Sequence, residues 1–394
     1  MKGQTYPAAR IIAPRIQTLF TEHVAEARRR GLHPIATVPD AAAIEAIIGA
    51  AFWASLRREE GYVPKISLAF AGPHETLHPL RFERPLPLDS AALTRVAPAV
   101  ERAGIHLGVW PASDVPPGSE AQPAASEGDD LRVWGTARAI PATCFVLEVA
   151  APGLLVVKHH RGEESGKFVN VAVLEADEIK IVDQRSSSLP DGPAVLTSLV
   201  RFDSPASWVD SLGVLVQLAV SMRGHGRGGL LLVVPDASDG WRDSIVRPIP
   251  YAVSPPFSEL AILSRETQAA RRRPEWQESL VRTVNGIGGL TAVDGAVILT
   301  ASYEVLAFGA KIVRKAGSPQ VERVTVTEPI EDAQPSLVDP AQLGGTRHLS
   351  AAQFVHDQRE AVALVASQDG RFTVFAWSPR EQMVHAHRVE VLLL

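Results

Sequence analysis

Three runs of consecutive apolar residues in the C-terminal half constrain the fold of this 394-residue chain more than any other feature. They are Leu230–Val234, Ala296–Leu299 and Val362–Ala366. A strand that is apolar on both faces has to be covered on both sides, as strands are in α/β proteins. Helix-like segments such as Trp276–Val284 stand between these runs. The sequence therefore predicts an α/β C-terminal half, in which helices flank a mixed sheet.

The N-terminal half has a different order of elements. An amphipathic helical segment, Ile16–Arg30, and a second helical segment, Asp40–Glu60, come early. Short apolar strand-like segments follow from Leu131 to Asp183. We expect an α+β domain with a β-rich second half, an antiparallel sheet of about five strands. The turn-rich stretch Arg185–Pro193 marks a boundary near its end. The predicted domains are residues 1–200 and 201–394.

Composition narrows the classes of partner. The net charge of −5 argues against a broad nucleic-acid-binding surface. The sequence has neither an uninterrupted apolar run of about 18 residues nor a signal-peptide core, so we expect a cytoplasmic protein without a membrane partner. The lone Cys144 is expected to be a small buried hydrophobe. His385 and His387 are expected on an exposed strand face.

Two short motifs in the C-terminal half combine residues that suit phosphate chemistry. Asp294-Gly295-Ala296 opens the second apolar run, and Gly345-Thr346-Arg347-His348 forms a Gly-rich turn before a helix-like segment. A carboxylate at a strand edge can hold a metal or take a proton. The turn offers backbone N–H groups, a hydroxyl, a guanidinium and an imidazole to a phosphate. Taken alone, Asp294 is also an ordinary turn residue and His348 an ordinary hydrogen bonder at a helix start.

Together these motifs resemble the DGA and GTRH motifs of the diadenylate cyclase (DAC) domain, and the resemblance extends over residues 205–380. It implies helices at Ser207–Arg223, Ser254–Ser264 and Gly345–Val355, interleaved with the apolar strands. It also implies an enzyme that condenses two ATP molecules into cyclic di-AMP with Mg²⁺ or Mn²⁺. Because each DAC site holds one ATP, it implies a homodimer or larger homo-oligomer with two sites face to face.

The resemblance assigns roles residue by residue. It implies catalytic roles for Asp294, Arg347 and His348, and metal binding by Asp294 and His348. Asp294 would help to activate a ribose 3′-hydroxyl, and the backbone at Ile312 would read the adenine edge. The nucleotide-binding residues that it implies are Gly295, Ala296, Ile312, Gly345, Thr346, Arg347, His348 and Ser367.

The chain departs from the family at two positions. The family continues its turn with an arginine where this chain has Leu349, and its later Ser-Glu pair is Ser367-Gln368 here. One phosphate-binding cation and one carboxylate are therefore missing, and each loss weakens transition-state stabilisation. An alternative function follows, that of a catalytically degenerate DAC-like receptor or scaffold. A structural protein without a nucleotide is a further alternative. The Gly224–Gly229 segment is expected to be a tight connection, with the nucleotide nearby as a second possibility.

Residues 1–200 resemble the sensor domain called DACNV, which accompanies some of these cyclases. The resemblance rests on position, on the Arg132-Val133-Trp134-Gly135 segment and on the strand-like run after it. It implies a sensor that controls the cyclase in response to a small-molecule or protein signal.

Overall fold

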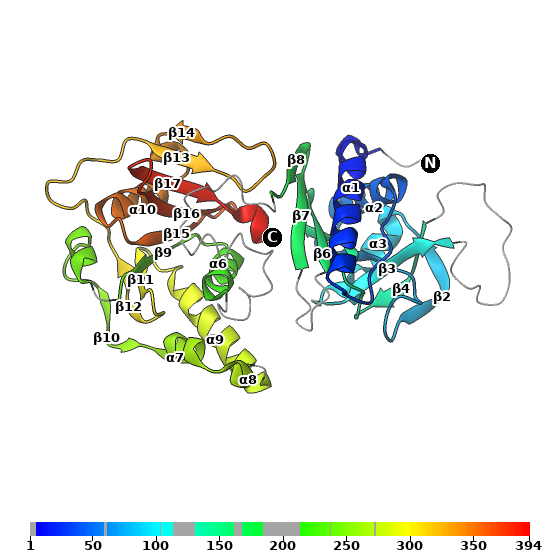
Figure 1. The fold of residues 1–394 in the computed structure, drawn as a ribbon, viewed down its shortest axis with the longest axis horizontal. Coiled ribbons are helices and arrows are strands. Elements are labelled where there is room, and N and C mark those ends of the chain that lie inside the picture. The colour runs from blue at the N-terminus through cyan, green and yellow to red at the C-terminus, as the bar shows by residue number, and fades with distance from the viewer. Residues whose placement is uncertain are drawn as a thin grey trace. The chain divides into compact units, whose positions relative to one another are not determined.

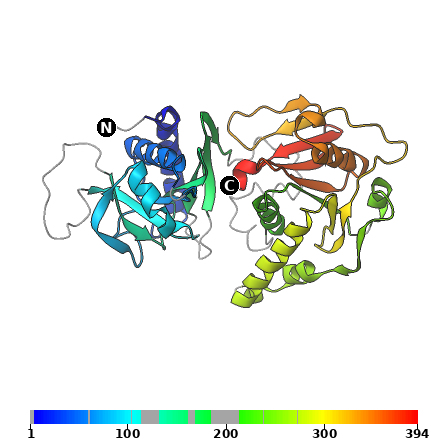
Figure 2. The same cartoon turned by 180° about the vertical axis from the view of Figure 1, so that it is seen from behind.

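The computed structural model describes residues 5–58, 61–102, 104–112, 131–160, 168–183, 213–236, 238–271 and 273–394. It divides into two compact units, Met1–Val182 with Leu394, and Asp183–Leu393. Each unit contains one mixed β-sheet with helices (Figures 1 and 2). This confirms the predicted mixture of α/β and α+β architecture. The predicted boundary near residue 200 lies outside the described residues.

The N-terminal unit begins with helices and continues with strands. Asp40 and Asp89 accept hydrogen bonds from the backbone N–H of Ala43 and Ala92 at 2.7 and 2.8 Å, so each caps the helix that follows it. The helices are α1 (Pro7–Arg29), α2 (Ala41–Ser55) and α3 (Ser90–Val96), with a 3₁₀ turn η1 (Ala97–Val100). The strands are β1 (Ser67–Phe70), β2 (Leu80–Pro87), β3 (His106–Pro111), β4 (Leu131–Ala137), β5 (Phe145–Ala151), β6 (Leu154–His160), β7 (Phe168–Glu175) and β8 (Glu178–Ile181).

These strands form one eight-stranded sheet in the order β2-β4-β3-β1-β5-β6-β7-β8. Strands β1 and β3 are parallel, and the other neighbours are antiparallel. The five predicted strand segments from Leu131 to Asp183 are β4 to β8, but their sheet has eight strands because β1 to β3 belong to it as well. The earlier strands join the same sheet because β1 pairs with β5, which lies far along the chain. Strand β2 was missed because it is a largely exposed edge strand without an apolar alternation.

Helices α1 and α2 pack on one face of this sheet, over β5 to β8. Their apolar residues join a single core with the sheet, and Cys144 is buried within it as predicted. Trp134 in β4 is also in this core. Its indole Nε1 donates to the carbonyl of Ala71 at 2.8 Å, and its ring covers Gly108, where a Cβ atom would lie 2.1 Å from the ring. The Arg132–Gly135 segment is thus part of the packing of β4 on β3.

His106 at the start of β3 is a buried polar residue of this unit. Its Nδ1 lies 2.7 Å from the hydroxyl of Ser67 on the neighbouring strand, and only 2% of the residue is exposed. Burial lowers the pKa of His106 from 6.5 to about 4, and the charge of Glu148 opposes that shift only in part. The imidazole is therefore neutral in the folded protein near pH 7.

We expect acid to destabilise the chain through His106. Between pH 6.5 and about 4, the unfolded chain binds a proton at His106 that the folded chain does not, so stability falls as pH falls. From pH 7 to pH 5 this amounts to about 2 kcal/mol. Urea unfolding of the full chain at pH 7 and pH 5 measures the free energy of unfolding that is lost on acidification. This loss should be smaller by about 2 kcal/mol in His106→Gln than in the wild type. The exposed His33→Gln is the control; equal losses in the wild type and His106→Gln would contradict the expectation.

The C-terminal unit alternates helices and strands. Its helices are α6 (Val214–Gly224), α7 (Glu259–Arg265), α8 (Gln268–Arg271), α9 (Pro274–Leu290) and α10 (Thr346–Asp357), with 3₁₀ turns η3 (Gly240–Ser244), η4 (Pro340–Gln342) and η5 (Glu390–Leu392). Its strands are β9 (Gly229–Val234), β10 (Tyr251–Phe257), β11 (Ala296–Thr300), β12 (Val305–Ala310), β13 (Val324–Thr327), β14 (Ser336–Val338), β15 (Val362–Ala366), β16 (Phe372–Ser378) and β17 (Met383–Arg388).

These strands form a nine-stranded sheet in the order β10-β12-β11-β9-β15-β16-β17-β13-β14. Helices α6 and α9 pack against each other on one face, and α10 packs on the other, over β9 and β15 to β17. The side chains of β9 alternate between the two cores: Leu231 and Val233 join α6 and α9, whereas Leu230 and Leu232 join the α10 side. The predicted two-sided burial of the apolar runs is confirmed.

Two predictions for this unit were wrong in detail. Residues 251–257 form the edge strand β10, and the expected helix begins only at Glu259. His385 and His387 are 3% and 1% exposed, because β17 is an interior strand and pairs with both β16 and β13. The first part of the predicted Ser207–Arg223 helix lies outside the described residues. Among the helices that the structure does describe, none has both the length and the apolar character needed to cross a membrane.

Candidate functional site

The residues that the motifs single out lie where several interior strands of the C-terminal sheet begin or end, and this row of strand ends is called the edge below. Strands β9 and β11 are parallel and begin at this edge, whereas β12 and β15 are antiparallel to them and end there. Gly229 of β9 pairs with Ala366 of β15, and Ala296 of β11 pairs with Ala310 of β12. The residues just outside these pairs, from four separate loops, are therefore neighbours at the edge: Gly228, Asp294, Lys311 and Ser367 with Gln368.

Asp294 lies at this edge with a cation beside it. Its carboxylate is 88% exposed, and its Oδ2 accepts a hydrogen bond from the ammonium Nζ of Lys311 at 2.5 Å. The hydrogen bond and the charge of Lys311 lower the pKa of Asp294, and the charge of Arg347 adds to that effect. Asp294 is therefore ionised at neutral pH and lies within electrostatic reach of the arginine of the second motif.

Gly295 holds the backbone beside Asp294 against the neighbouring strand. Its φ is +119°, and a Cβ atom there would lie 2.4 Å from the carbonyl carbon of Gly309 in β12. A side chain at residue 295 would collide with backbone that cannot easily move, so only glycine fits. This close approach of β11 to β12 brings Asp294 beside Lys311, which follows β12 directly. Ala296, the third residue of the motif, is buried.

The second motif places a helix start and a guanidinium at the same edge. Helix α10 begins at Thr346, with Gly345 as its N-cap, and no side chain of the described residues caps it. Its first backbone N–H groups suit an anion. Arg347 lies against Gly228 on the loop before β9: a Cβ atom on Gly228 would lie 3.0 Å from its Nη1. The glycine-rich connection is thus next to the predicted phosphate-binding turn.

His348 is placed differently from its neighbours in the motif. It is only 2% exposed, and its ring makes an edge contact with Phe375 of β16 at a centroid distance of 6.0 Å. Burial lowers the pKa of His348. Thr346 is exposed and Ser367 is half-buried. The structure therefore brings Asp294, Arg347, Thr346 and Ser367 to accessible positions, while the imidazole lies in the core; the roles of these residues stay predictions.

The backbone N–H and C=O groups of Ile312 are not used in pairing with Ile245. Ile312 and Ile245 form an isolated antiparallel bridge, closed by Val246 N–H to the Lys311 carbonyl at 2.8 Å and by Val313 N–H to the Ser244 carbonyl at 2.9 Å. Adjacent residues of an extended chain direct their N–H and C=O groups to opposite sides. The N–H and C=O groups of Ile312 therefore point away from Ile245. This orientation is compatible with the predicted contact to an adenine edge.

The loop before β9 is fixed by a histidine that sequence reasoning did not single out. Thr291 Oγ1 donates to the Gly288 carbonyl at 2.6 Å, so it accepts from His225 Nε2 at 3.0 Å. The Nδ1 of His225 accepts from the Arg227 N–H at 3.1 Å. One imidazole nitrogen donates and the other accepts, which assigns a neutral ring. His225 thus connects the loop to the end of α9 and helps to position Gly228.

Lys311 is the other residue that sequence reasoning missed. It lies next to Ile312 in the segment that the resemblance covers, but an isolated lysine in a polar stretch carries no signal of its own. Strands β11 and β12 pair Ala296 with Ala310, so Lys311 comes beside the Asp294-Gly295 segment. The register of β11 against β12, rather than a motif, is the information that identifies it.

This edge offers one exposed carboxylate to a divalent ion, that of Asp294. Among the described residues, no group of three or more histidine, cysteine, aspartate or glutamate side chains could hold a metal. The exposed carboxylate of Asp294 is a hard oxygen donor, and Mg²⁺ is commonly held by one or two carboxylates together with substrate phosphates. Asp294 therefore suits Mg²⁺ or Mn²⁺ as part of a metal–nucleotide complex, and the residues do not form a self-sufficient metal site.

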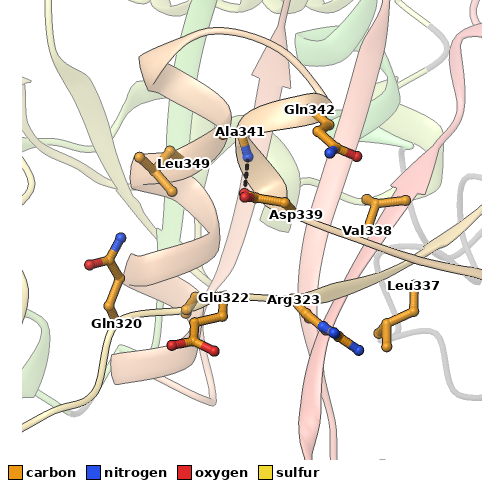
Figure 3. A pocket seen from close by; sticks show the side chains of 10 residues that line it. Gln320, Glu322, Arg323, Leu337, Val338, Asp339, Ala341, Gln342 and Leu349 are labelled. Atoms are coloured by element: carbon orange, nitrogen blue, oxygen red, sulfur yellow. Dashed lines mark hydrogen bonds between the residues drawn. The ribbon is translucent and has the colours of Figure 1, made fainter.

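A separate surface recess of about 710 Å³ lies beside α10 (Figure 3). Its walls come from the segment before β13, from β14 and from η4. It is lined by Gln320, Val321, Glu322, Arg323, Leu337, Val338, Asp339, Ala341, Gln342 and Leu349. Leu349 follows Arg347 by two positions and is therefore about 200° around the helix from it. The departure at Leu349 thus changes this recess rather than the helix face that bears Arg347.

Comparison with known proteins gives a family match for the N-terminal unit. Residues 33–116 match the family model described as "Probable sensor domain DACNV". This match confirms the predicted resemblance to DACNV over residues 33–116, which include β1 to β3 of the eight-stranded sheet. The Arg132–Gly135 segment, on which the prediction rested in part, lies after the matched range. No curated protein matches the chain.

Two solved structures are similar to part of the chain at 15% sequence identity. One is a hypothetical membrane spanning protein from Bacillus cereus, with a TM-score of 0.26 over 44% of this chain. This chain spans 62% of its length. The other is a double mutant of DacA from Staphylococcus aureus, with a TM-score of 0.22 over 44% of this chain and 83% of that one.

We expect Gly295→Ala to disrupt the edge. The added methyl group would meet the backbone of Gly309, and the residue would have to keep a φ of +119°. Strain and overlap together should lower the free energy of unfolding by about 2–4 kcal/mol. Urea unfolding of the full chain measures this change. Gly286→Ala in α9 is the matched control, because a Cβ atom there meets no other atom within 4 Å. Gly286→Ala should be at least as stable as the wild type, because alanine favours a helix. A Gly295→Ala variant as stable as the wild type would contradict the close approach.

Proposed function

We propose that the C-terminal unit binds ATP at this sheet edge and that two copies condense two ATP into cyclic di-AMP. The observation that supports this most is the meeting of the two motifs: ionised Asp294 and Arg347 come from distant parts of the sequence and interact electrostatically at one edge. The motifs resemble those of the diadenylate cyclase domain. A nucleotide site that uses both motifs requires them to lie at the same edge of the sheet.

The proposed reaction is phosphoryl transfer. The 3′-oxygen of one ATP attacks the α-phosphorus of the other, the bond to the β-phosphate breaks and pyrophosphate leaves; the same step in the other direction closes the ring. Catalysis of this kind is mainly positioning and charge stabilisation. Asp294 would accept the hydrogen bond of the attacking hydroxyl. Arg347 and the first N–H groups of α10 would bind phosphate oxygens. A bound Mg²⁺ or Mn²⁺ would supply further neutralisation of phosphate charge.

The proposal requires a second copy of the chain. Each C-terminal unit has one such edge, and the reaction joins two nucleotides, so two edges would have to face each other. The match of residues 33–116 to a probable sensor domain supports a regulatory N-terminal unit. A small-molecule or protein signal bound there would shift the population of the productive pair.

A second function is favoured by two contacts at the edge. Lys311 already pairs with the carboxylate of Asp294. The amide of Gln368 donates to the Arg227 carbonyl at 3.4 Å, which an ionised glutamate at that position could not do. In both contacts, polar or charged groups of the site are satisfied by other groups of the same chain. A nucleotide receptor that binds ATP without turning it over would have such a site.

Asp294→Asn distinguishes the functions. We expect the wild-type chain to form cyclic di-AMP from ATP and Mn²⁺ or Mg²⁺, and the variant to lose about 100-fold or more of that rate. Mass spectrometry of the reaction products measures both. Asp332→Asn is the control, since Asp332 is an exposed carboxylate in the same unit with a left-handed backbone that asparagine tolerates.

Other outcomes would change the proposal. Full activity in Asp294→Asn would exclude the assigned role of the carboxylate. If the wild type gave no product although ATP raised its melting temperature, the receptor function would be supported instead. Neither product nor a thermal shift would contradict nucleotide binding altogether.

A further inference from the structure

Lys311 and Asp294 form an ion pair whose charged groups are exposed, whereas the backbone of Lys311 is held in place. The backbone of Lys311 is fixed, because its carbonyl accepts from the Val246 N–H at 2.8 Å. Its side chain is 49% exposed and the carboxylate of Asp294 is 88% exposed. Water surrounds the pair, so the ammonium can leave the carboxylate at a small free-energy cost. The anchored backbone keeps the ammonium within reach whether or not the pair is closed.

The position of this ammonium matters because Asp294 is the carboxylate that suits a divalent ion. A cation on Oδ2 at 2.5 Å occupies the place of a metal on that oxygen. Without any cation, the ionised carboxylate would repel the triphosphate that Arg347 and the start of α10 attract. With the ammonium present, that repulsion is removed before a metal arrives.

We propose that Lys311 is a resident countercation for Asp294: it neutralises the carboxylate in place of a metal, so that the unit binds nucleotide with little dependence on a divalent ion. This inference rests on the proposed nucleotide binding and goes beyond it. Lys311 is a positioning residue in this role, because it acts on the nucleotide through Asp294. A metal that binds Oδ2 of Asp294 has to displace the ammonium, so metal and Lys311 compete for that oxygen.

Nucleotide affinity with and without metal tests the proposal. The full-length chain is titrated calorimetrically with α,β-methylene-ATP, which cannot be cleaved at the reacting bond, once in EDTA and once with Mn²⁺. The quantity compared is the dissociation constant in EDTA divided by the dissociation constant with Mn²⁺. In Lys311→Met we expect weaker binding in EDTA and undiminished binding with Mn²⁺, so that the ratio rises about fivefold over the wild type. Lys311→Arg keeps the charge and should restore the wild-type ratio.

The matched control is Lys315→Met. Lys315 is 45% exposed, close to the value for Lys311, but its ammonium pairs with a different carboxylate, that of Asp243, at 3.6 Å. It should keep the wild-type ratio. An equal loss of affinity in both buffers for Lys311→Met would overturn the proposal, since it would make Lys311 a direct phosphate ligand. If the wild type bound no analogue in either buffer, the proposed function and this inference would both fail.

Discussion

The C-terminal unit depends on the two-sided burial of β9. Its side chains alternate between the core under α6 and α9 and the core under α10. A shift of one residue would exchange the two sets, so packing on both faces fixes the register of β9 against β11 and β15. That register determines which loops meet at the edge. Gly228, Asp294 and the residues after Ala366 are neighbours because the strands they flank cannot slide.

This constraint explains how much of the site the sequence could predict. The apolar runs gave β9, β11 and β15 nearly to the residue, since burial on both faces leaves a local signature. The DGA and GTRH motifs are also local patterns, and they pointed to Asp294 and Arg347, although neither of these residues is buried. Lys311 and Gly228 have no such signature, because their importance comes from pairing across strands. A local pattern indicates which residues can act, and the register indicates which of them meet.

Other features depend on tertiary context that no local pattern contains. Strand β10 is an exposed edge with two prolines, and its pairing with β12 overrides the helical pattern that the sequence suggests. The histidines of β17 alternate as a half-exposed strand would, yet a further strand and its surroundings bury them. In the N-terminal unit, the sheet is larger than predicted because β1 pairs with β5 across a long stretch of chain.

The departures from the DAC motifs concern the charge of the edge. Where the family has a glutamate, Gln368 is neutral and donates to the loop that supports Arg347. Lys311 adds a cation at the carboxylate that remains. Gln368 and Lys311 both make the charge less negative near the place where a triphosphate would bind, and so reduce what a metal has to neutralise. Leu349 acts in the opposite direction, because it removes a cation, although its side chain lines the recess beside α10. Under the proposed nucleotide binding, Gln368 and Lys311 would let this edge hold part of the nucleotide charge with its own side chains.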